Sequence, residues 1–408
     1  FRIIRDLGFN FVRLPMDYRL WIVDGDWNRF DEQTLAEIDQ AVGYGKKYRI
    51  HVCIAFHRAP GYTVANPPEP RSLWTDPEAQ AVCARHWALF ARRYKGLPNR
   101  QLSFNLMNEP AHVDSATYAQ VALRLLEAIH EEDPERLVIS DGLEFGKQPC
   151  AELVGHEVAQ ATRGYMPSGI SHYKASWVQN SENMPEPAWP RPQAYGTLYG
   201  SAKPNLQAPL AITGPFPQGG TLRLRVGVVS DRARLGVFAD GVEILSKDFV
   251  CGPGEGEWKS SAYKEQWDLY QNVYDRDYAA EIPAGARTVT ITVRDGDWLR
   301  LTELGLRAGT DEREHTLSLL PDWGNPPADL TFDPTRAGSA FAAERQQDRE
   351  WLWETMIVPW KKTEARGVGV VVGEWGAFKH TPHDVTLRWM EDCLRNWRKA
   401  GWGWALWN

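Results

Sequence analysis

Short apolar runs alternate with longer amphipathic segments along most of this chain of 408 residues, and this alternation is what most constrains the fold. Apolar residues spaced three and four apart predict helices, whereas short apolar runs between turn signals predict buried strands. Strands that alternate with helices of this length form parallel sheets. The predicted strands lie near residues 9, 50, 101, 136, 169, 368 and 402, and the clearest helices cover 31–48, 76–94, 114–132, 348–367 and 384–401.

The segment 2–7 is typical of the end of a helix that stops at Gly8, and no strand precedes it. One strand upstream, added to the seven, would make eight strand–helix units, the number in a closed (β/α)₈ barrel. We therefore expect an α/β protein with a (β/α)₈ TIM barrel that lacks its first strand and last helix. This barrel is predicted to comprise residues 1–178 and 335–408.

A different pattern interrupts the alternation after the strand predicted near residue 169, which is the sixth strand when the inferred upstream strand is counted. Apolar and polar residues alternate with a period of two, as in half-buried antiparallel strands, over 221–229, 233–245 and 287–304. The dipeptides Asp240-Gly241 and Asp295-Gly296 are typical of hairpin turns between such strands. We predict an inserted antiparallel β-sandwich over 204–310, with 179–203 and 311–334 as connecting segments.

Composition excludes several classes of protein. Hydrophobic residues make up 43% of the chain and aromatic residues 12%, which is too much burial material for a mainly disordered protein. The net charge is −7, whereas nucleic-acid binders and binders of anionic membranes carry the opposite sign. We therefore expect no nucleic-acid partner, no membrane partner and a monomeric protein.

The five cysteines are widely spaced, and no two of them form a CxxC pair. This pattern indicates neither a disulfide scaffold nor a zinc site. Because the spacing of histidines and carboxylates also lacks a metal-ligand pattern, we expect no metal and no cofactor.

Two glutamates follow predicted strands directly. Glu109 comes after the strand over 101–107, and Glu374 comes after the strand over 368–372. The carboxyl ends of barrel strands meet at one mouth, where barrel enzymes keep their catalytic groups. Retaining glycoside hydrolysis needs two carboxylates about 5–5.5 Å apart, one as acid/base and one as nucleophile. The sequence therefore predicts that Glu109 and Glu374 form a catalytic pair.

Six short motifs, in this order, resemble glycoside hydrolase family 5, the cellulase-type family of retaining (β/α)₈ enzymes. The resemblance covers most of residues 1–178 and 348–408. The motifs are VRLP at 12–15, HRAPG at 57–61, MNEP at 107–110, SHY at 171–173, GEWG at 373–376 and ALWN at 405–408.

The resemblance implies a role for each matching residue. Glu109 is expected to be the general acid/base and Glu374 the nucleophile. Asn108 would bond the 2-hydroxyl of the sugar, and Arg13 would lie beside Glu374. The other implied substrate contacts are His57 and His172 in the mouth, Trp407 as a stacking floor, and Trp375.

One position departs from the family pattern. The family often carries His-x-Tyr on the sixth strand, and its tyrosine touches the nucleophile. Here Tyr173 directly follows His172, and position 174 is a lysine. Either a local twist brings Tyr173 to Glu374, or the contact is made differently.

Together these patterns predict a retaining glycoside hydrolase that cleaves β-glycosidic bonds in plant-type polysaccharides or oligosaccharides, with a secreted or cell-envelope location. One alternative is a barrel that binds carbohydrate without catalysis. Another is a lyase or aldolase, for which Lys174 is the candidate Schiff-base lysine. The aromatic-rich stretch 257–278 of the insert predicts a carbohydrate-binding module, a wall that extends the active-site cleft, or a surface that docks the insert on the barrel.

Overall fold

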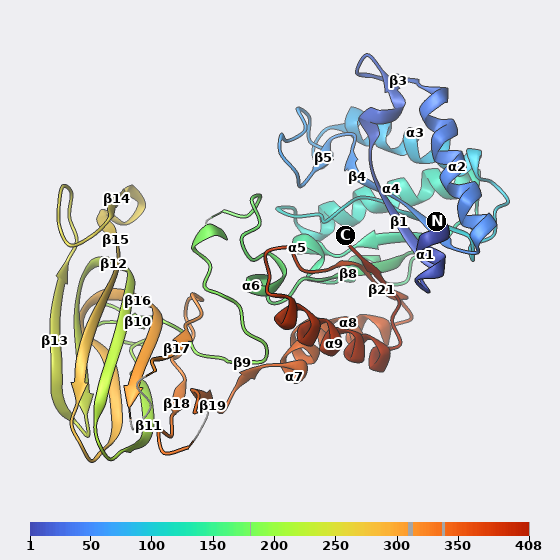
Figure 1. Ribbon diagram of the computed structural model, residues 1–408. Helices are drawn as coiled ribbons and strands as arrows, with labels where there is room; N and C mark the ends of the chain where they lie inside the picture. The colour runs from blue at the N-terminus through green and yellow to red at the C-terminus, as the bar shows by residue number, and fades with distance from the viewer. Residues whose placement is uncertain (180, 309–312, 337–338, 408) are drawn as a thin grey trace. The chain divides into compact units, whose positions relative to one another are not determined.

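The structure is a computed structural model that describes residues 1–179, 181–308, 313–336 and 339–407. Asn408, the last residue of the ALWN motif, lies outside the described residues. The chain divides into two compact units, Phe1–Glu182 with Arg349–Asn408 and Asn183–Asp348 (Figure 1). Residues 335–348, which the sequence analysis gave to the barrel, therefore belong to the second unit.

The first unit is built on a parallel sheet whose strands follow one another in chain order, as in a TIM barrel. The predicted fold class is confirmed for this unit. In the described residues β1 and β22 are the two ends of the sheet, and a short β5 (Tyr62–Thr63) turns back to pair with β4. The parallel strands are β1 (Phe11–Asp17), β4 (His51–Ala59), β6 (Leu102–Asn105), β7 (Val138–Asp141), β8 (Ala159–Gly164), β21 (Val370–Trp375) and β22 (Trp404–Leu406).

Helices begin and end within about two residues of their predicted bounds, because their caps are readable in the sequence. Asp31, Asp76 and Asp114 each accept a backbone N–H at a helix start, as N-cap residues do. Leu35, Ile38 and other residues of the predicted stripes are buried. The helices are α1 (Arg2–Asp6), α2 (Glu32–Tyr48), α3 (Pro77–Arg93), α4 (Ser115–Glu132), α5 (Leu143–Gly146) and α9 (His383–Ala400).

The helix predicted over 348–367 is interrupted. It consists of α7 (Arg349–Leu352), a π-helical segment at Trp353–Ile357 and α8 (Val358–Glu364). Pro359 lies in the first turn of α8, where its missing N–H cannot bond back to the preceding turn. The proline therefore explains why the helix changes its winding just before it.

The sixth strand is not where the sequence analysis placed it. Residues 169–173 do not form a strand: α6 spans Ser168–Ser171, and the sixth strand is β8, ten residues earlier. This strand carries Gln160, Thr162 and Arg163, all buried, so it shows no apolar run. Gln160 is satisfied by two hydrogen bonds of 2.9 Å to the backbone of Cys150. Because pairing compensates the polar groups, hydrophobicity alone could not reveal this strand.

The second unit lies between β8 and β21 in the chain. Its sheet is mainly antiparallel, although β11 and β18 pair in parallel. The strands are β10 (Thr197–Tyr199), β11 (Leu210–Phe216), β12 (Gly220–Ala239), β13 (Val242–Val250), β14 (Ser260–Lys264), β15 (Leu269–Ile282), β16 (Ala286–Ala308), β17 (His315–Ser318), β18 (Asp329–Thr331) and β19 (Ala342–Ala343).

Two long strands, β12 and β16, run beside each other through the whole of this sheet (Figure 1). The other edge of β12 pairs first with β15 and then with β13, and irregularities in the register mark the change. Bulges bend strands and increase their twist. The sheet consequently encloses one apolar core, which includes Leu224, Leu235 and Ile291.

The two predicted hairpin turns have different outcomes. Asp240-Gly241 joins β12 to β13 with positive φ at both residues, 47° and 83°, as a two-residue hairpin requires. Asp295-Gly296 lies inside β16 instead, so that turn prediction is wrong. Gly296 has φ 94°, and a Cβ there would lie 2.1 Å from the carbonyl oxygen of Arg232. Gly296 therefore allows a local irregularity within the long strand β16.

The aromatic stretch of the insert is divided between core and surface. Tyr274 is buried against Phe249, and Trp258 packs on Tyr274. Trp267 is 58% exposed and Tyr263 is 49% exposed. The stretch therefore combines packing residues with a small exposed aromatic surface.

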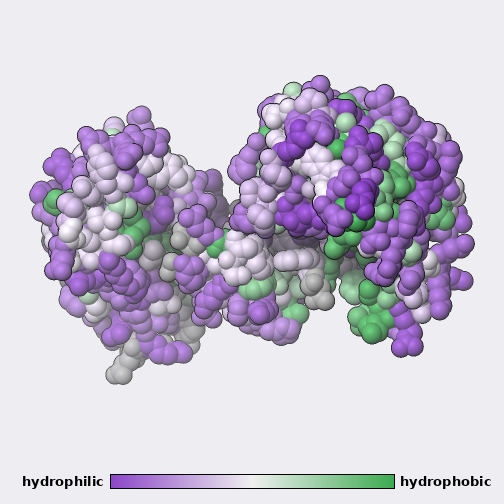
Figure 2. Space-filling model, turned by 90° about the horizontal axis from the view of Figure 1, so that it is seen from above, coloured by the Kyte–Doolittle hydropathy of each residue, from purple (hydrophilic) through white to green (hydrophobic). Residues whose placement is uncertain are grey.

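Hydrophilic residues cover most of the visible surface of both units, and hydrophobic residues gather on part of the barrel unit (Figure 2). Large exposed hydrophobic side chains of this unit include Ile3, Leu7, Leu20 and Leu387. Across the described ranges, every helix is too short or too polar to span a bilayer.

Gly164 at the end of β8 lies close to Trp375 of β21 and to Trp397 of α9. A Cβ at this position would lie 2.6 Å from Cβ of Trp375 and 2.7 Å from the ring of Trp397. We expect Gly164→Ala to lower the free energy of unfolding by about 1–3 kcal/mol through overpacking. Urea unfolding followed by tryptophan fluorescence would measure the change.

The matched control is Gly43→Ala in α2, where no heavy atom lies within 4 Å of the added Cβ. Alanine in an open helix position is expected to stabilise the protein by up to about 1 kcal/mol. Equal stability of the two variants would contradict the packing argument.

Candidate active site

Glu109 follows β6 in a backbone conformation that is unusual for a residue with a side chain. Its φ is 51°, in the left-handed region. Hydrogen bonds hold its peptide groups on both sides: its N–H donates to Asp141 Oδ2 at 2.9 Å, and its carbonyl accepts from the Tyr62 hydroxyl at 2.7 Å. The backbone is thereby fixed so that the carboxylate lies beside Arg163, whose Nε donates to Glu109 Oε1 at 2.9 Å.

Glu374 lies within β21 and is held by two donors. Arg13 Nη1 on β1 donates to Glu374 Oε2 at 2.8 Å, and the Tyr165 hydroxyl, just after β8, donates to Glu374 Oε1 at 2.7 Å. Each carboxylate oxygen therefore has its own partner. The bond from Arg13 is also an ion pair, and charge-assisted bonds of this kind are shorter and stronger than neutral ones.

Asn108 connects the surroundings of the two glutamates. Its Oδ1 accepts from Arg13 Nη2 at 2.9 Å and from Arg163 Nη2 at 3.0 Å. Two cationic donors on the oxygen fix the orientation of the amide, so that Nδ2 points away from them. Nδ2 is buried and has no hydrogen-bond partner among the described protein atoms.

Arg163 and Asp141 form a buried ion pair next to Glu109. Arg163 Nη2 donates to Asp141 Oδ2, and the other oxygen of Asp141 accepts from Asn105 Nδ2 at 2.9 Å. Asn105 in turn accepts from Arg13 Nε at 2.9 Å. The network thus links β1, β6, β7 and β8 below the two glutamates.

Electrostatics distinguish the groups of this cluster. Burial raises the pKa of Glu109, with Glu374 and Asp141 adding to the rise and Arg163 opposing it. Burial also raises the pKa of the Tyr165 hydroxyl, and the adjacent Glu374 carboxylate raises it further. Burial lowers the pKa of His57. The site therefore holds a neutral histidine, a tyrosine that donates, and a glutamate that resists ionisation.

Comparison with known proteins gives a consistent assignment for this unit. Residues 1–185 match the family model described as cellulase, glycosyl hydrolase family 5. Endoglucanase C of Acetivibrio thermocellus is 28% identical over 182 residues, which are 44% of this chain and 52% of that protein. Cellodextrinase A of Ruminococcus flavefaciens is 31% identical over 106 residues, 26% of this chain and 31% of that protein.

The part of the barrel unit over residues 1–185 thus resembles glycoside hydrolase family 5. The chain spans about half the length of the first curated relatives that it matches. Among solved structures, a glycoside hydrolase has a TM-score of 0.60 at 24% identity, and endoglucanase Cel5A of Thermotoga maritima has 0.53 at 14%. Each alignment covers 100% of this chain and 80% of the other, and at these identities it supports the fold.

Several of the residues implied by the family 5 resemblance lie together in the structure. Arg13, Asn108, Glu109 and Glu374 form the bonded cluster described above. Charges of Glu374, Arg13 and Arg163 act on His57, which places this histidine near them. Burial lowers the pKa of His172 as well, and its Nδ1 lies 2.7 Å from Ser171 Oγ.

An aromatic surface lies beside Tyr165, whose hydroxyl donates to Glu374. The Tyr165 ring is 6.3 Å from Trp407 and 5.0 Å from His172, measured between centroids. Trp407 is 43% exposed, and Trp177, with its ring 5.7 Å away, is 53% exposed. Trp177 and Trp407 thus present open ring surface next to the residue that bonds Glu374.

Two of the expected substrate contacts, Trp375 and Tyr173, lie outside the cluster. Trp375 is fully buried against Trp389, Trp397 and Trp404, so its ring has no surface for a sugar, and the predicted contact is wrong. Consecutive strand residues point to opposite faces, so Glu374 and Trp375 separate. Tyr173 is buried beneath exposed Lys174, whose Nζ is 4.9 Å from the Tyr173 ring.

The contact expected of Tyr173 is made by Tyr165. The sequence Arg163-Gly164-Tyr165 has the His-x-Tyr spacing of the family, with arginine in place of histidine. That spacing could have identified Tyr165 from the sequence. It was overlooked because the sixth strand was predicted at 169–173 instead of at β8. Arg163, Asp141 and Asn105 were also missed, because buried polar residues within strands resemble surface positions in the sequence.

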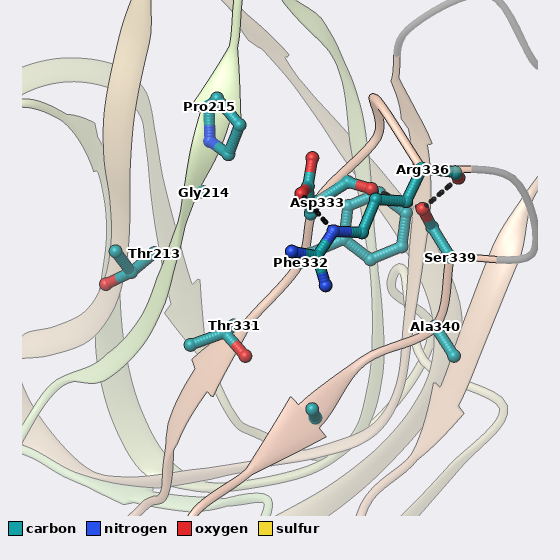
Figure 3. A pocket seen from close by; sticks show the side chains of 10 residues that line it. Thr213, Gly214, Pro215, Thr331, Phe332, Asp333, Arg336, Ser339 and Ala340 are labelled. Carbon is teal, nitrogen blue, oxygen red and sulfur yellow. Dashed lines mark hydrogen bonds and ion pairs between the residues drawn. The ribbon is translucent and has the colours of Figure 1, made fainter.

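Outside the barrel unit, a cavity of about 390 Å³ lies in the second unit, and none of the predicted site residues lines it (Figure 3). Its polar groups bond one another: Arg336 pairs with Asp333 at 3.1 Å, and Ser339 Oγ donates to the Arg336 carbonyl at 2.6 Å. Among the residues that the structure describes, histidine, cysteine and carboxylate side chains form no group that could hold a metal ion.

Proposed function

We propose that this protein is a retaining glycoside hydrolase that cleaves β-glycosidic bonds in plant-type polysaccharides or their oligosaccharides. Glu374 is the nucleophile and Glu109 the general acid/base. The observation that carries the proposal is the contrast between the two glutamates. Two donors stabilise the Glu374 carboxylate, whereas burial and neighbouring carboxylates raise the pKa of Glu109. Environments that separate two carboxyl groups in this way assign the acid and the nucleophile.

In the first step, Glu374 attacks the anomeric carbon and forms a carbon–oxygen bond to it. The bond from this carbon to the leaving oxygen breaks, and the proton of Glu109 passes to that oxygen. In the second step, water attacks the same carbon and gives its proton to Glu109, while the bond to Glu374 breaks. Each of the two substitutions inverts the configuration of the anomeric carbon, so the product has the same configuration as the substrate.

The remaining groups support substrate binding. The free Nδ2 of Asn108 is a donor aimed away from both arginines, which suits a sugar hydroxyl such as the 2-hydroxyl. The exposed rings of Trp177 and Trp407 suit the apolar C–H faces of β-linked sugars. The relatives named endoglucanase and cellodextrinase favour β-glucans and their short oligosaccharides as the first substrates to test.

The alternatives have less support. Lys174 is exposed and lies over the Tyr173 ring, so it does not provide a buried amine for Schiff-base chemistry. A barrel that only binds carbohydrate would not need a hydroxyl and a guanidinium on separate oxygens of one carboxylate.

We expect Glu374→Gln to lower turnover of an aryl β-glycoside by at least about 10³-fold, because the nucleophile is lost. Glu109→Gln should lower turnover by about 10²–10⁴-fold for a poor leaving group and far less for a good one, which needs no acid. Steady-state kinetics on both substrates would test the roles, and NMR of the product should show retained configuration. Undiminished turnover by Glu374→Gln would exclude Glu374 as the nucleophile, whereas no turnover by the unchanged protein would support the binding-only alternative.

Removal of the hydroxyl on the nucleophile gives a second test. Tyr165→Phe loses a hydrogen bond to a charged group, worth about 1.5–3 kcal/mol, so kcat/KM should fall by about 10–100-fold. Tyr173→Phe is the matched control, because that ring lies under Lys174 and makes no bond to Glu374. Equal losses in the two variants would remove Tyr165 from the mechanism.

The exposed tryptophans give a third test. Trp407→Ala should raise KM for a cello-oligosaccharide by roughly fivefold or more, since truncation of an aromatic contact in a binding site costs over about 1 kcal/mol. Trp267→Ala, an exposed tryptophan of the second unit, should leave this KM unchanged. An unchanged KM in Trp407→Ala would exclude the stacking role.

A further inference from the structure

Arg163 is an unexpected neighbour for a residue that must hold and release a proton. A guanidinium remains charged at every pH that the protein meets. Its Nε lies 2.9 Å from Glu109 Oε1, and the Arg163 side chain is only 2% exposed. A permanent buried cation at this distance would, acting alone, keep Glu109 ionised.

Asp141 changes this balance. It is fully buried, pairs with Arg163 and also accepts the backbone N–H of Glu109. Two cations, Arg13 and Arg163, then face two carboxylates, Glu374 and Asp141. The cluster is neutral when Glu109 carries a proton and has a charge of −1 when Glu109 is ionised.

We propose that Arg163 and Asp141 act as a pair of positioning residues that determines when Glu109 holds its proton, so that Glu109 and not Glu374 serves as the acid/base. The inference rests on the proposed function. Arg163 stabilises the carboxylate that Glu109 becomes when it protonates the leaving oxygen. Asp141 prevents this stabilisation from being permanent, so that Glu109 takes a proton back from water in the second step.

The pair also explains the geometry of the acid/base. The two nitrogens of the Arg163 fork bond Glu109 and Asn108, which are adjacent in the chain. Asp141 fixes the peptide of Glu109 in its left-handed conformation. A histidine in place of Arg163, as the family spacing suggests, has neither the permanent charge nor the fork.

Other charged and titratable groups that interact with Glu109 or with its neighbours come from several elements, and the variants below leave them unchanged. They are Arg13 on β1, His57 on β4, Tyr62 on β5, Glu144 on α5, Tyr165 after β8 and Glu374 on β21.

The pH dependence of kcat/KM on an aryl β-glycoside with a poor leaving group tests the pair, because this reaction needs protonated Glu109. Arg163→Gln removes a cation, so the pKa of Glu109 rises and the alkaline limb should move up by about one pH unit or more. Asp141→Asn removes an anion, so the limb should move down. The double variant Arg163→Gln/Asp141→Asn restores the charge balance, and its limb should return toward that of the unchanged protein.

Arg163→Lys separates charge from geometry. It keeps the cation and loses the fork, so its alkaline limb should stay near that of the unchanged protein while kcat falls. A merely structural role of Arg163 would lower activity in every variant without moving the limbs in opposite directions. Coincident alkaline limbs in Arg163→Gln, Asp141→Asn and the unchanged protein would overturn the proposal.

A direct titration of Glu109 tests this inference independently of the proposed function, because it needs no catalytic turnover. Carbon-13 NMR of labelled glutamate carboxyls, with Glu109 assigned through Glu109→Gln, measures the pKa of Glu109 without any substrate. A higher value in Arg163→Gln and a lower one in Asp141→Asn would support the pair even if no glycoside were cleaved. If Arg163→Gln does not fold, Asp141→Asn and the double variant, compared with the unchanged protein, decide the question in the same way.

Discussion

One oxygen atom, Oδ1 of Asn108, accepts hydrogen bonds from two guanidinium groups, and the geometry of the barrel mouth depends on this shared acceptor. Each arginine extends from it to a different glutamate, Arg13 to Glu374 and Arg163 to Glu109. Buried cations are tolerated only when carboxylates pair with them. Glu374 therefore pairs with the arginine that holds it, whereas Arg163, which holds Glu109, is also paired with Asp141.

Much of the fold could be predicted because most barrel strands are apolar and most helices carry readable caps. Glu109 and Glu374 were found since each follows such a strand, where the mouth of a barrel must lie. β8 was missed because Gln160, Thr162 and Arg163 are buried through hydrogen bonds and ion pairs, which a hydropathy pattern does not record. Tyr165 was lost with that strand. The residues hardest to predict were thus those whose burial depends on partners far away in the chain.

In the inserted unit, the local sequence likewise does not decide whether an Asp-Gly pair forms a hairpin turn. Asp240-Gly241 and Asp295-Gly296 have the same local preference, yet one connects two strands and the other lies within a strand of 23 residues. The difference comes from the neighbouring strand, because β12 continues past Gly296 and pairs on both sides of it. The local sequence therefore indicated a positive φ at both glycines, but it did not indicate which of them lies in a turn. An apolar core of its own allows this unit to interrupt the barrel between β8 and β21.

The left-handed backbone of Glu109 has a consequence for how such a site changes over time. A residue with a side chain pays about 1–3 kcal/mol in this conformation, and asparagine, aspartate or glycine would fit it better. Folding alone thus favours the loss of glutamate at this position, and only the chemistry favours its retention. In descendants that no longer used the barrel mouth, position 109 is where drift would be expected first, well before the apolar strands that support it.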